Sequence, residues 1–103
     1  MLKLTIYDVP GREIQAIGLV KGNVVQAKNI GRDLMAGLKG MAGGEIKSYT
    51  EMMTEARQIA TARMEKEAEA LGADAIIGLN FTSSSVMDGT AEIIAYGTAV
   101  KFL

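Results

Sequence analysis

The side chains best suited to chemistry gather around a predicted junction between two helices. Arg32 and Asp33 open a predicted short helix, and Glu45 and Tyr49 lie at the start of a long one. Arg57 follows Tyr49 by eight residues, a spacing that places both on one helical face. Free backbone N–H groups at a helix start favour an anion, either a ligand's or the Glu45 carboxylate. These five residues are therefore the candidate ligand-binding residues.

The same cluster has a structural interpretation, which we favour. Gly43-Gly44 allows a tight chain reversal that brings the ends of both helices together. We expect Asp33 and Glu45 to accept hydrogen bonds from helix-start amides or from an arginine, as part of a capping and salt-bridge network.

Metal and catalytic sites have little support in the residue types. The chain contains no His and no Cys, so it lacks the usual ligands of zinc and transition metals. Without Cys it can form no disulfide and has no thiol chemistry. The carboxylates that could hold Mg²⁺ or Ca²⁺ are not at EF-hand spacing; they are Asp33, Glu45, Glu51, Glu55 and Glu92. The seven Met residues are better explained as core. We assign no metal ligand, no catalytic residue and no known cofactor.

Composition narrows the class of protein. The 103 residues are enough for one domain, residues 1–103. A net charge of −1 with scattered Lys and Arg gives no electrostatic footprint for nucleic acid. No uninterrupted apolar run reaches the roughly 18 residues of a membrane span, and the N-terminal residues turn polar too soon for a signal peptide. We expect a cytoplasmic location.

The pattern predicts an α+β domain, with an antiparallel sheet wrapped on one long helix. Strands are expected over residues 2–7, 13–28, 74–83 and 90–103, a short helix over 33–41 and the main helix over 46–71. Gly22-Asn23 could be a hairpin turn or a bulge in one long strand, and we favour the bulge. The apolar positions of the main helix are spaced by threes and fours; they are Ile46, Tyr49, Met53, Ala56, Ala60, Met64, Ala68 and Leu71.

The last strand, residues 90–103, is apolar on both faces. One alternating set is Ile94, Tyr96, Thr98, Val100 and Phe102, and the other is Ile93, Ala95, Gly97 and Ala99. One face can pack on the long helix, but a chain this short has little left to cover the other. A second subunit is therefore the expected cover.

Several motifs in this order resemble the YbjQ-like family over residues 17–100. They are Gly31-Arg32-Asp33, Gly43-Gly44-Glu45, Tyr49, the stretch from Leu71 to Gly78, and Gly97-Thr98-Ala99-Val100. The resemblance implies an α+β subunit related to the dodecin-like folds, assembly as a homopentamer, and a family label of heavy-metal binding. It supplies no established catalytic residue.

We interpret the protein as a non-enzymatic homo-oligomer, a pentamer if the resemblance holds, that binds a small ligand or ion at its subunit interfaces. One alternative is a small enzyme with an active site shared between subunits. Another is metal binding through carboxylates, which needs at least three oxygen ligands brought together. A pocket of convergent polar groups with perturbed ionisation would favour the enzyme.

Overall fold

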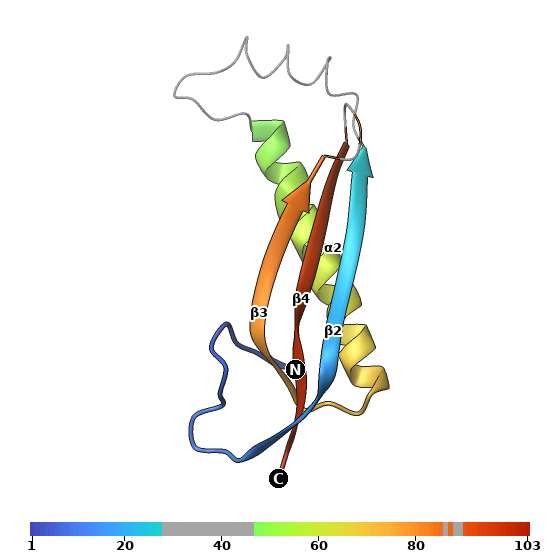
Figure 1. The fold of residues 1–103 in the computed structure, drawn as a ribbon. Coiled ribbons are helices and arrows are strands. Elements are labelled where there is room, and N and C mark those ends of the chain that lie inside the picture. The colour runs from blue at the N-terminus through green and yellow to red at the C-terminus, as the bar shows by residue number, and fades with distance from the viewer. Residues whose placement is uncertain (28–46, 86, 88–89) are drawn as a thin grey trace.

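One long helix packs on one face of a four-stranded sheet (Figure 1). The computed structural model describes residues 1–27, 47–85, 87 and 90–103. Its elements are β1 (Leu2–Lys3), β2 (Ile14–Ala27), α2 (Lys47–Ala70), β3 (Ala75–Ser84) and β4 (Thr90–Phe102). The α+β class and the single long helix are thus confirmed, and the short helix expected over 33–41 lies outside the described residues.

The sheet is mixed rather than antiparallel, which corrects the sequence-based expectation. Its strand order is β1-β3-β4-β2; β4 pairs antiparallel with both neighbours, but β1 pairs parallel with β3. The first strand is also shorter than the expected 2–7. Beyond Lys3 the chain still runs along β3, because Leu4 N donates to Ile76 O and Gly78 N donates to Ile6 O, but the pairing is irregular.

β2 is one continuous strand, and the expected bulge at Gly22-Asn23 is wrong. Gly22 and Asn23 pair in register with Ala95 and Ile94, and the register shift falls earlier, between Ala16 and Gly18. Ile17 is the extra residue there. A bulge bends a strand, so the bend in β2 lies near its start rather than at its middle.

Gly22 is needed for a different reason, the close approach of the helix. A Cβ at Gly22 would collide with the backbone of α2 at Ala60 and Met64. On the helix side, Ala56, Ala60, Met64 and Ala68 are fully buried. Small residues on both elements therefore let α2 lie directly on β2, and this contact is the centre of the core.

The helix boundaries and its buried stripe largely match the sequence pattern. α2 begins and ends within one residue of the expected limits. Two positions differ: Met52 is more deeply buried than Met53, and Leu71 is 49% exposed beyond the helix end. Arg63 and Glu67, which have the spacing of an ion pair, each bind the β2 backbone: Arg63 Nη1 donates to Asn23 O (2.7 Å), and Glu67 accepts from Lys21 N (3.3 Å).

The two faces of β4 have different environments. Ile93, Ala95 and Ala99 are buried against α2. On the opposite face, which we call the outer face, Val100 is buried in a second cluster with Ala75, Ile77 and Val9. The N-terminal segment covers that cluster through Val9 and Leu4. Only the lower part of the outer face, around Val100 near the end of β4, is therefore protected. The remaining part of this face carries Tyr96, which is 38% exposed.

Replacing Gly22 by Ala should be severely destabilising. The added methyl group meets helix backbone, which cannot rotate aside, so we expect a loss of about 2 kcal/mol or more, the upper range for overpacking a core. Denaturant unfolding of Gly22→Ala measures the loss. The neighbouring exposed residue gives the control, Lys21→Ala, which should stay within about 0.5 kcal/mol of the wild type. Equal effects of the two changes would contradict this account of the core.

Candidate functional site

Of the five candidate residues, two are described, and both lie on α2. Tyr49 is half-buried in the first turns of the helix, and Arg57 is exposed two turns later. Arg57 Nη2 donates to Thr54 Oγ1 (3.3 Å) on the same helix. Arg32, Asp33 and Glu45 lie outside the described residues, so the clustering of all five stays a prediction.

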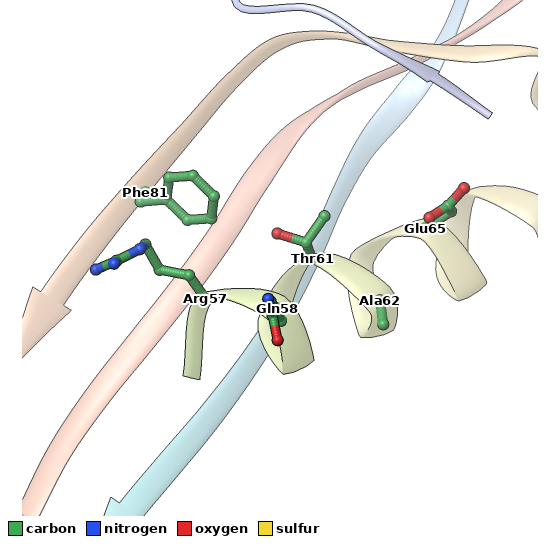
Figure 2. A pocket seen from close by; sticks show the side chains of 6 residues that line it. All are labelled: Arg57, Gln58, Thr61, Ala62, Glu65 and Phe81. Atoms are coloured by element: carbon green, nitrogen blue, oxygen red, sulfur yellow. The ribbon is translucent and has the colours of Figure 1, made fainter. Parts of the chain in front are cut away.

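Arg57 instead belongs to a groove between α2 and β3 (Figure 2). The groove has a volume of about 370 Å³ and is open on one side. Its lining residues are Arg57, Gln58, Thr61, Ala62, Glu65 and Phe81. Five of them come from one face of the helix, and Phe81 faces them from the strand. This volume is at the lower end of the range typical of small-molecule sites.

A bulge in β3 aims Phe81 into the groove. Ile77 pairs with Thr98, but Asn80 pairs with Tyr96, so Gly78 and Leu79 together oppose the single residue Gly97. Side chains alternate along a strand, so if this sequence formed a regular strand with no bulge, Phe81, four residues after Ile77, would lie on the outer face with it. Gly78 permits the bulge with a φ of +61°.

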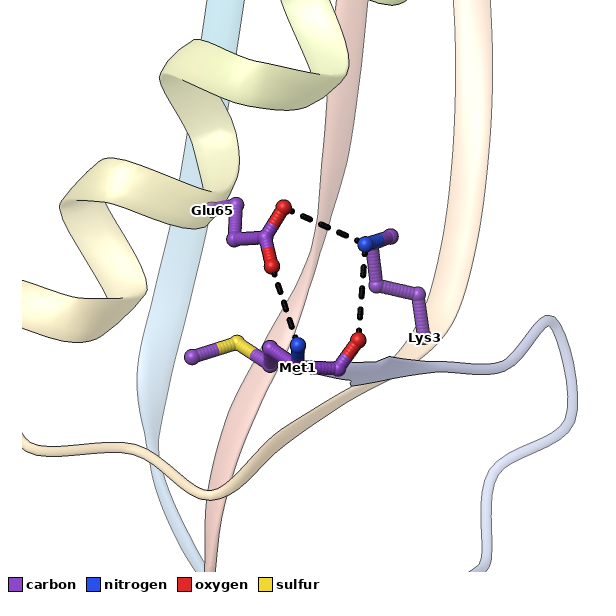
Figure 3. A network of polar contacts seen from close by, with 3 residues as sticks. All are labelled: Met1, Lys3 and Glu65. Atoms are coloured by element: carbon purple, nitrogen blue, oxygen red, sulfur yellow. Dashed lines mark hydrogen bonds and ion pairs between the residues drawn. The ribbon is translucent and has the colours of Figure 1, made fainter.

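Glu65, one of the lining residues, also belongs to an ion-pair network with Met1 and Lys3 (Figure 3). The Glu65 carboxylate forms two ion pairs: Oε1 lies 3.1 Å from the Met1 ammonium nitrogen, and Oε2 lies 3.2 Å from Lys3 Nζ. The hydrogen bonds from the Met1 ammonium group and from Lys3 hold the pKa of Glu65 below its ordinary value. This network joins α2 to β1, the strand beside β3, and so fixes the distance between the two walls of the groove.

The polar groups of the groove leave bonding capacity for a ligand. Within the described part of the chain Arg57 has no acidic partner, and the side chains of Gln58 and Thr61 form no hydrogen bond. The Glu65 carboxylate, by contrast, is already neutralised by two cations. The groove therefore presents one uncompensated positive charge beside an aromatic ring. Such an arrangement can bind and orient a molecule.

Carboxylates do not converge in the described ranges. No group of three His, Cys, Asp or Glu side chains that could hold a metal ion occurs there. Glu92, one of the expected candidates, accepts hydrogen bonds from Ser84 Oγ (3.3 Å) and Asn23 Nδ2 (3.5 Å) on the outer face. Asp33 and Glu45 are not described, so the carboxylate alternative is tested only in part.

The outer face carries a second candidate surface, which we call the outer patch. It consists of Leu19 and Val25 on β2 and Ile94 and Tyr96 on β4, whose side chains point away from α2. Their partners across the two strands are polar, namely Thr98, Glu92, Asn23 and Lys21, and lie on the same face. Leu19 is 67% exposed and Val25 is 50% exposed. Single exposed apolar residues are common on soluble proteins, but several on adjacent strands form a surface that favours a protein partner.

Sequence reasoning missed every groove residue except Arg57. The helical residues recur at positions 57, 58, 61, 62 and 65, a spacing that marks one face of a helix. Phe81 required more: an isolated Gly in a strand is a known sign of a bulge, and Gly78 is such a residue. Only the pairing of β3 with β4 shows that the bulge at Gly78 moves Phe81 from the outer face of the sheet to the helix side.

The fold is shared with a solved structure. A crystal structure of a protein of unknown function from Pediococcus pentosaceus, assigned to the DUF74 family, matches with a TM-score of 0.68. The match covers 100% of this chain and 98% of that one, at 18% sequence identity. At this identity the likeness concerns the fold alone. Among the described residues, no helix is long and apolar enough to cross a bilayer.

The chain belongs to the YbjQ family, whose model, described as "Putative heavy-metal-binding", matches residues 1–103. Similar proteins of the UPF0145 group include one from Vibrio campbellii, 62% identical over 100% of both chains. Another, from Thermotoga maritima, is 60% identical over 98% of this chain and 96% of its own. A third, from Clostridium novyi, is 56% identical over 100% of both. The resemblance read from the sequence is therefore confirmed.

Replacing Glu65 by Gln should lower stability in a pH-dependent way. The pKa of Glu65 is lowered on folding, so its ion pairs stabilise the fold above the ordinary glutamate value of about 4.3. As the pH falls through the lowered value, the carboxylate is protonated and the contribution is lost. We expect Glu65→Gln to cost about 1 kcal/mol or less at pH 7, because the group is partly exposed.

The measurement is denaturant unfolding of both proteins between pH 3 and pH 7 at one protein concentration. The gap between them should narrow as the pH falls below the ordinary glutamate value of about 4.3 and through the lowered pKa of Glu65. Glu69→Gln, on the same helix, provides the control, because the Glu69 side chain forms no ion pair among the described residues. A gap that is constant with pH, or equal to that of Glu69→Gln, would show that the network contributes nothing.

Proposed function

We propose that the protein is a non-enzymatic, cytoplasmic subunit of a homo-oligomer, with five copies as the family resemblance implies. The observation that carries the proposal is the outer patch. It lies on a sheet face that the described residues cover only at the lower end, through Val9 and its cluster. A neighbouring copy of the chain is the proposed cover of the rest.

The burial pattern of β4 supports this proposal and selects the contact face. The set with Ala95 and Ala99 is fully buried against α2 and has no surface left for a subunit. The set with Tyr96 retains exposed apolar area. The sequence left open which face meets the helix, and the contact with α2 leaves the outer face for assembly.

A ring of five imposes a further condition on the interface. A cyclic pentamer needs a heterologous contact, in which the outer patch of one copy meets a different surface of the next. Packing of outer patch against outer patch would be isologous and would give dimers instead. The mass of the assembly therefore distinguishes the two arrangements.

The family label of heavy-metal binding is not part of this proposal. The whole chain lacks His and Cys, so thiolate and imidazole ligands are absent from every copy in an assembly. The ion pairs of Glu65 account for its lowered pKa without a catalytic role.

Charging the outer patch should dissociate the assembly. We expect wild-type protein at micromolar concentration to sediment at the mass of five chains and Leu19→Asp to sediment as a smaller species. An unpaired charge buried in a contact costs about 3 kcal/mol or more, roughly a hundredfold or more in the dissociation constant. Since Leu19 is 67% exposed in the subunit, the change should leave the subunit folded.

Leu71→Asp is the matched control, because Leu71 is also half-exposed but follows the end of α2. It should retain the wild-type mass in sedimentation equilibrium, and circular dichroism should show all three proteins folded. A folded wild-type monomer at micromolar concentration would refute the proposal. Equal dissociation by both changes would remove the outer patch from the interface.

Zinc, nickel and cobalt should not bind tightly at neutral pH. The reason is the absence of His and Cys, the residues that hold these ions in most protein sites. Isothermal titration calorimetry on protein freed of any histidine tag is the measurement, since a tag would supply the missing ligands. A stoichiometric zinc signal with sub-micromolar affinity would show that the carboxylates form a site after all.

A further inference from the structure

We propose that the groove between α2 and β3 binds a small planar aromatic carboxylate, with its ring against Phe81 and its acid group on Arg57. The groove lies on the helix side of the sheet, away from the outer patch. The groove therefore shares no residue with the outer patch. It rests on the aromatic wall, the charge balance of the lining and the size of the space.

The aromatic wall is Phe81, which is 43% exposed although it lies on the helix side of its strand. The core of α2 packs over β2 and β4, and Phe81 is not among the side chains of that core. Arg57 and the short side chain of Thr61 lie across the groove from the ring (Figure 2), which is left accessible. An aromatic ring stacks on such a surface with more favourable energy than an aliphatic group of the same area.

The charge balance selects an acid rather than a base. Arg57 reaches from the helix toward the strand that carries Phe81 (Figure 2), and its one hydrogen bond to a described residue is to Thr54 Oγ1. The guanidinium group has five N–H donors, so most remain for a bidentate carboxylate. Glu65, the acidic residue of the lining, is neutralised by Lys3 and the Met1 ammonium group. A ligand carboxylate therefore meets a net positive groove.

The size and the remaining polar groups set the class of ligand. A space of about 370 Å³ accommodates one or two fused rings with an acid group, and it is too small for a folded protein segment. Gln58 and Thr61 are free to donate or accept hydrogen bonds at the ring edge. The site is open, so we expect binding in the micromolar range rather than tighter.

The experiment uses 2-naphthoate as the probe. The chain contains no Trp, so the fluorescence of the naphthalene ring can be followed with little protein background. We expect one probe to bind per chain. Arg57→Gln should weaken binding about tenfold, the usual effect of losing a charge-assisted hydrogen bond. Phe81→Leu should weaken it several-fold through the lost stacking. Both residues are exposed, so both variants should fold.

Two comparisons separate the groove from general charge and from other surfaces. Arg12→Gln removes the same charge near Phe102, where the Arg12 guanidinium lies 4.3 Å from the ring centre, and should leave binding unchanged. The neutral analogue 2-naphthamide should bind the wild type about as weakly as 2-naphthoate binds Arg57→Gln. It should also lose little on the Arg57→Gln change, because it has no carboxylate to pair.

Three results of the binding measurements would overturn the proposal. They are no binding of 2-naphthoate at millimolar concentration, equal weakening by Arg57→Gln and Arg12→Gln, and no effect of Phe81→Leu. Loss of binding on Leu19→Asp together with no effect of Phe81→Leu would place the probe on the outer patch. A change of sedimentation mass in Phe81→Leu would also contradict it, since a second copy of the chain would then occupy the groove.

Discussion

The close contact between α2 and β2 at Gly22 is the constraint on which the other features depend. The helix backbone occupies the space that a side chain at Gly22 would need, and fully buried Ala56, Ala60 and Ala68 extend the contact along the helix. Because the helix lies this close over β2 and β4, it leaves the helix side of β3 uncovered near Phe81. The core contact therefore creates the groove as well as the fold, and both follow from the placement of small residues.

The outer face is determined by the same contact. Because Ile93, Ala95 and Ala99 pack against α2, the alternate residues of β4 must point away from it. The N-terminal segment covers their lower members through Val9. It extends no further, because β1 pairs with β3 over only two residues at the far edge of the sheet. An apolar strand of 13 residues is thus half protected, which is the condition that the proposed assembly would relieve.

Periodicity made the main elements predictable, and local pairing made their details unpredictable. The period of α2 and the apolar runs of β3 and β4 set boundaries to within about a residue, because burial of one face dictates residue type along the whole element. A bulge leaves no comparable trace. The one in β2 falls at Ile17, five residues from the Gly-Asn pair that suggested it, since its position depends on the partner strand. The two-residue β1 and its parallel pairing likewise depend on distant contacts such as that of Glu65.

In the candidate site, too, part of the arrangement could be predicted from the sequence and part depends on strand pairing. Arg57 was identified from its charge and helical spacing, but its neighbours were expected at the junction of the helices. The structure places Phe81 in the same groove as Arg57, and that placement depends on the bulge at Gly78. A regular strand would carry Phe81 on the outer face and leave the groove without its aromatic wall. Gly78 therefore decides which of the two surfaces receives the aromatic ring. The bulge at Gly78 thus separates the proposed assembly surface from the proposed ligand site.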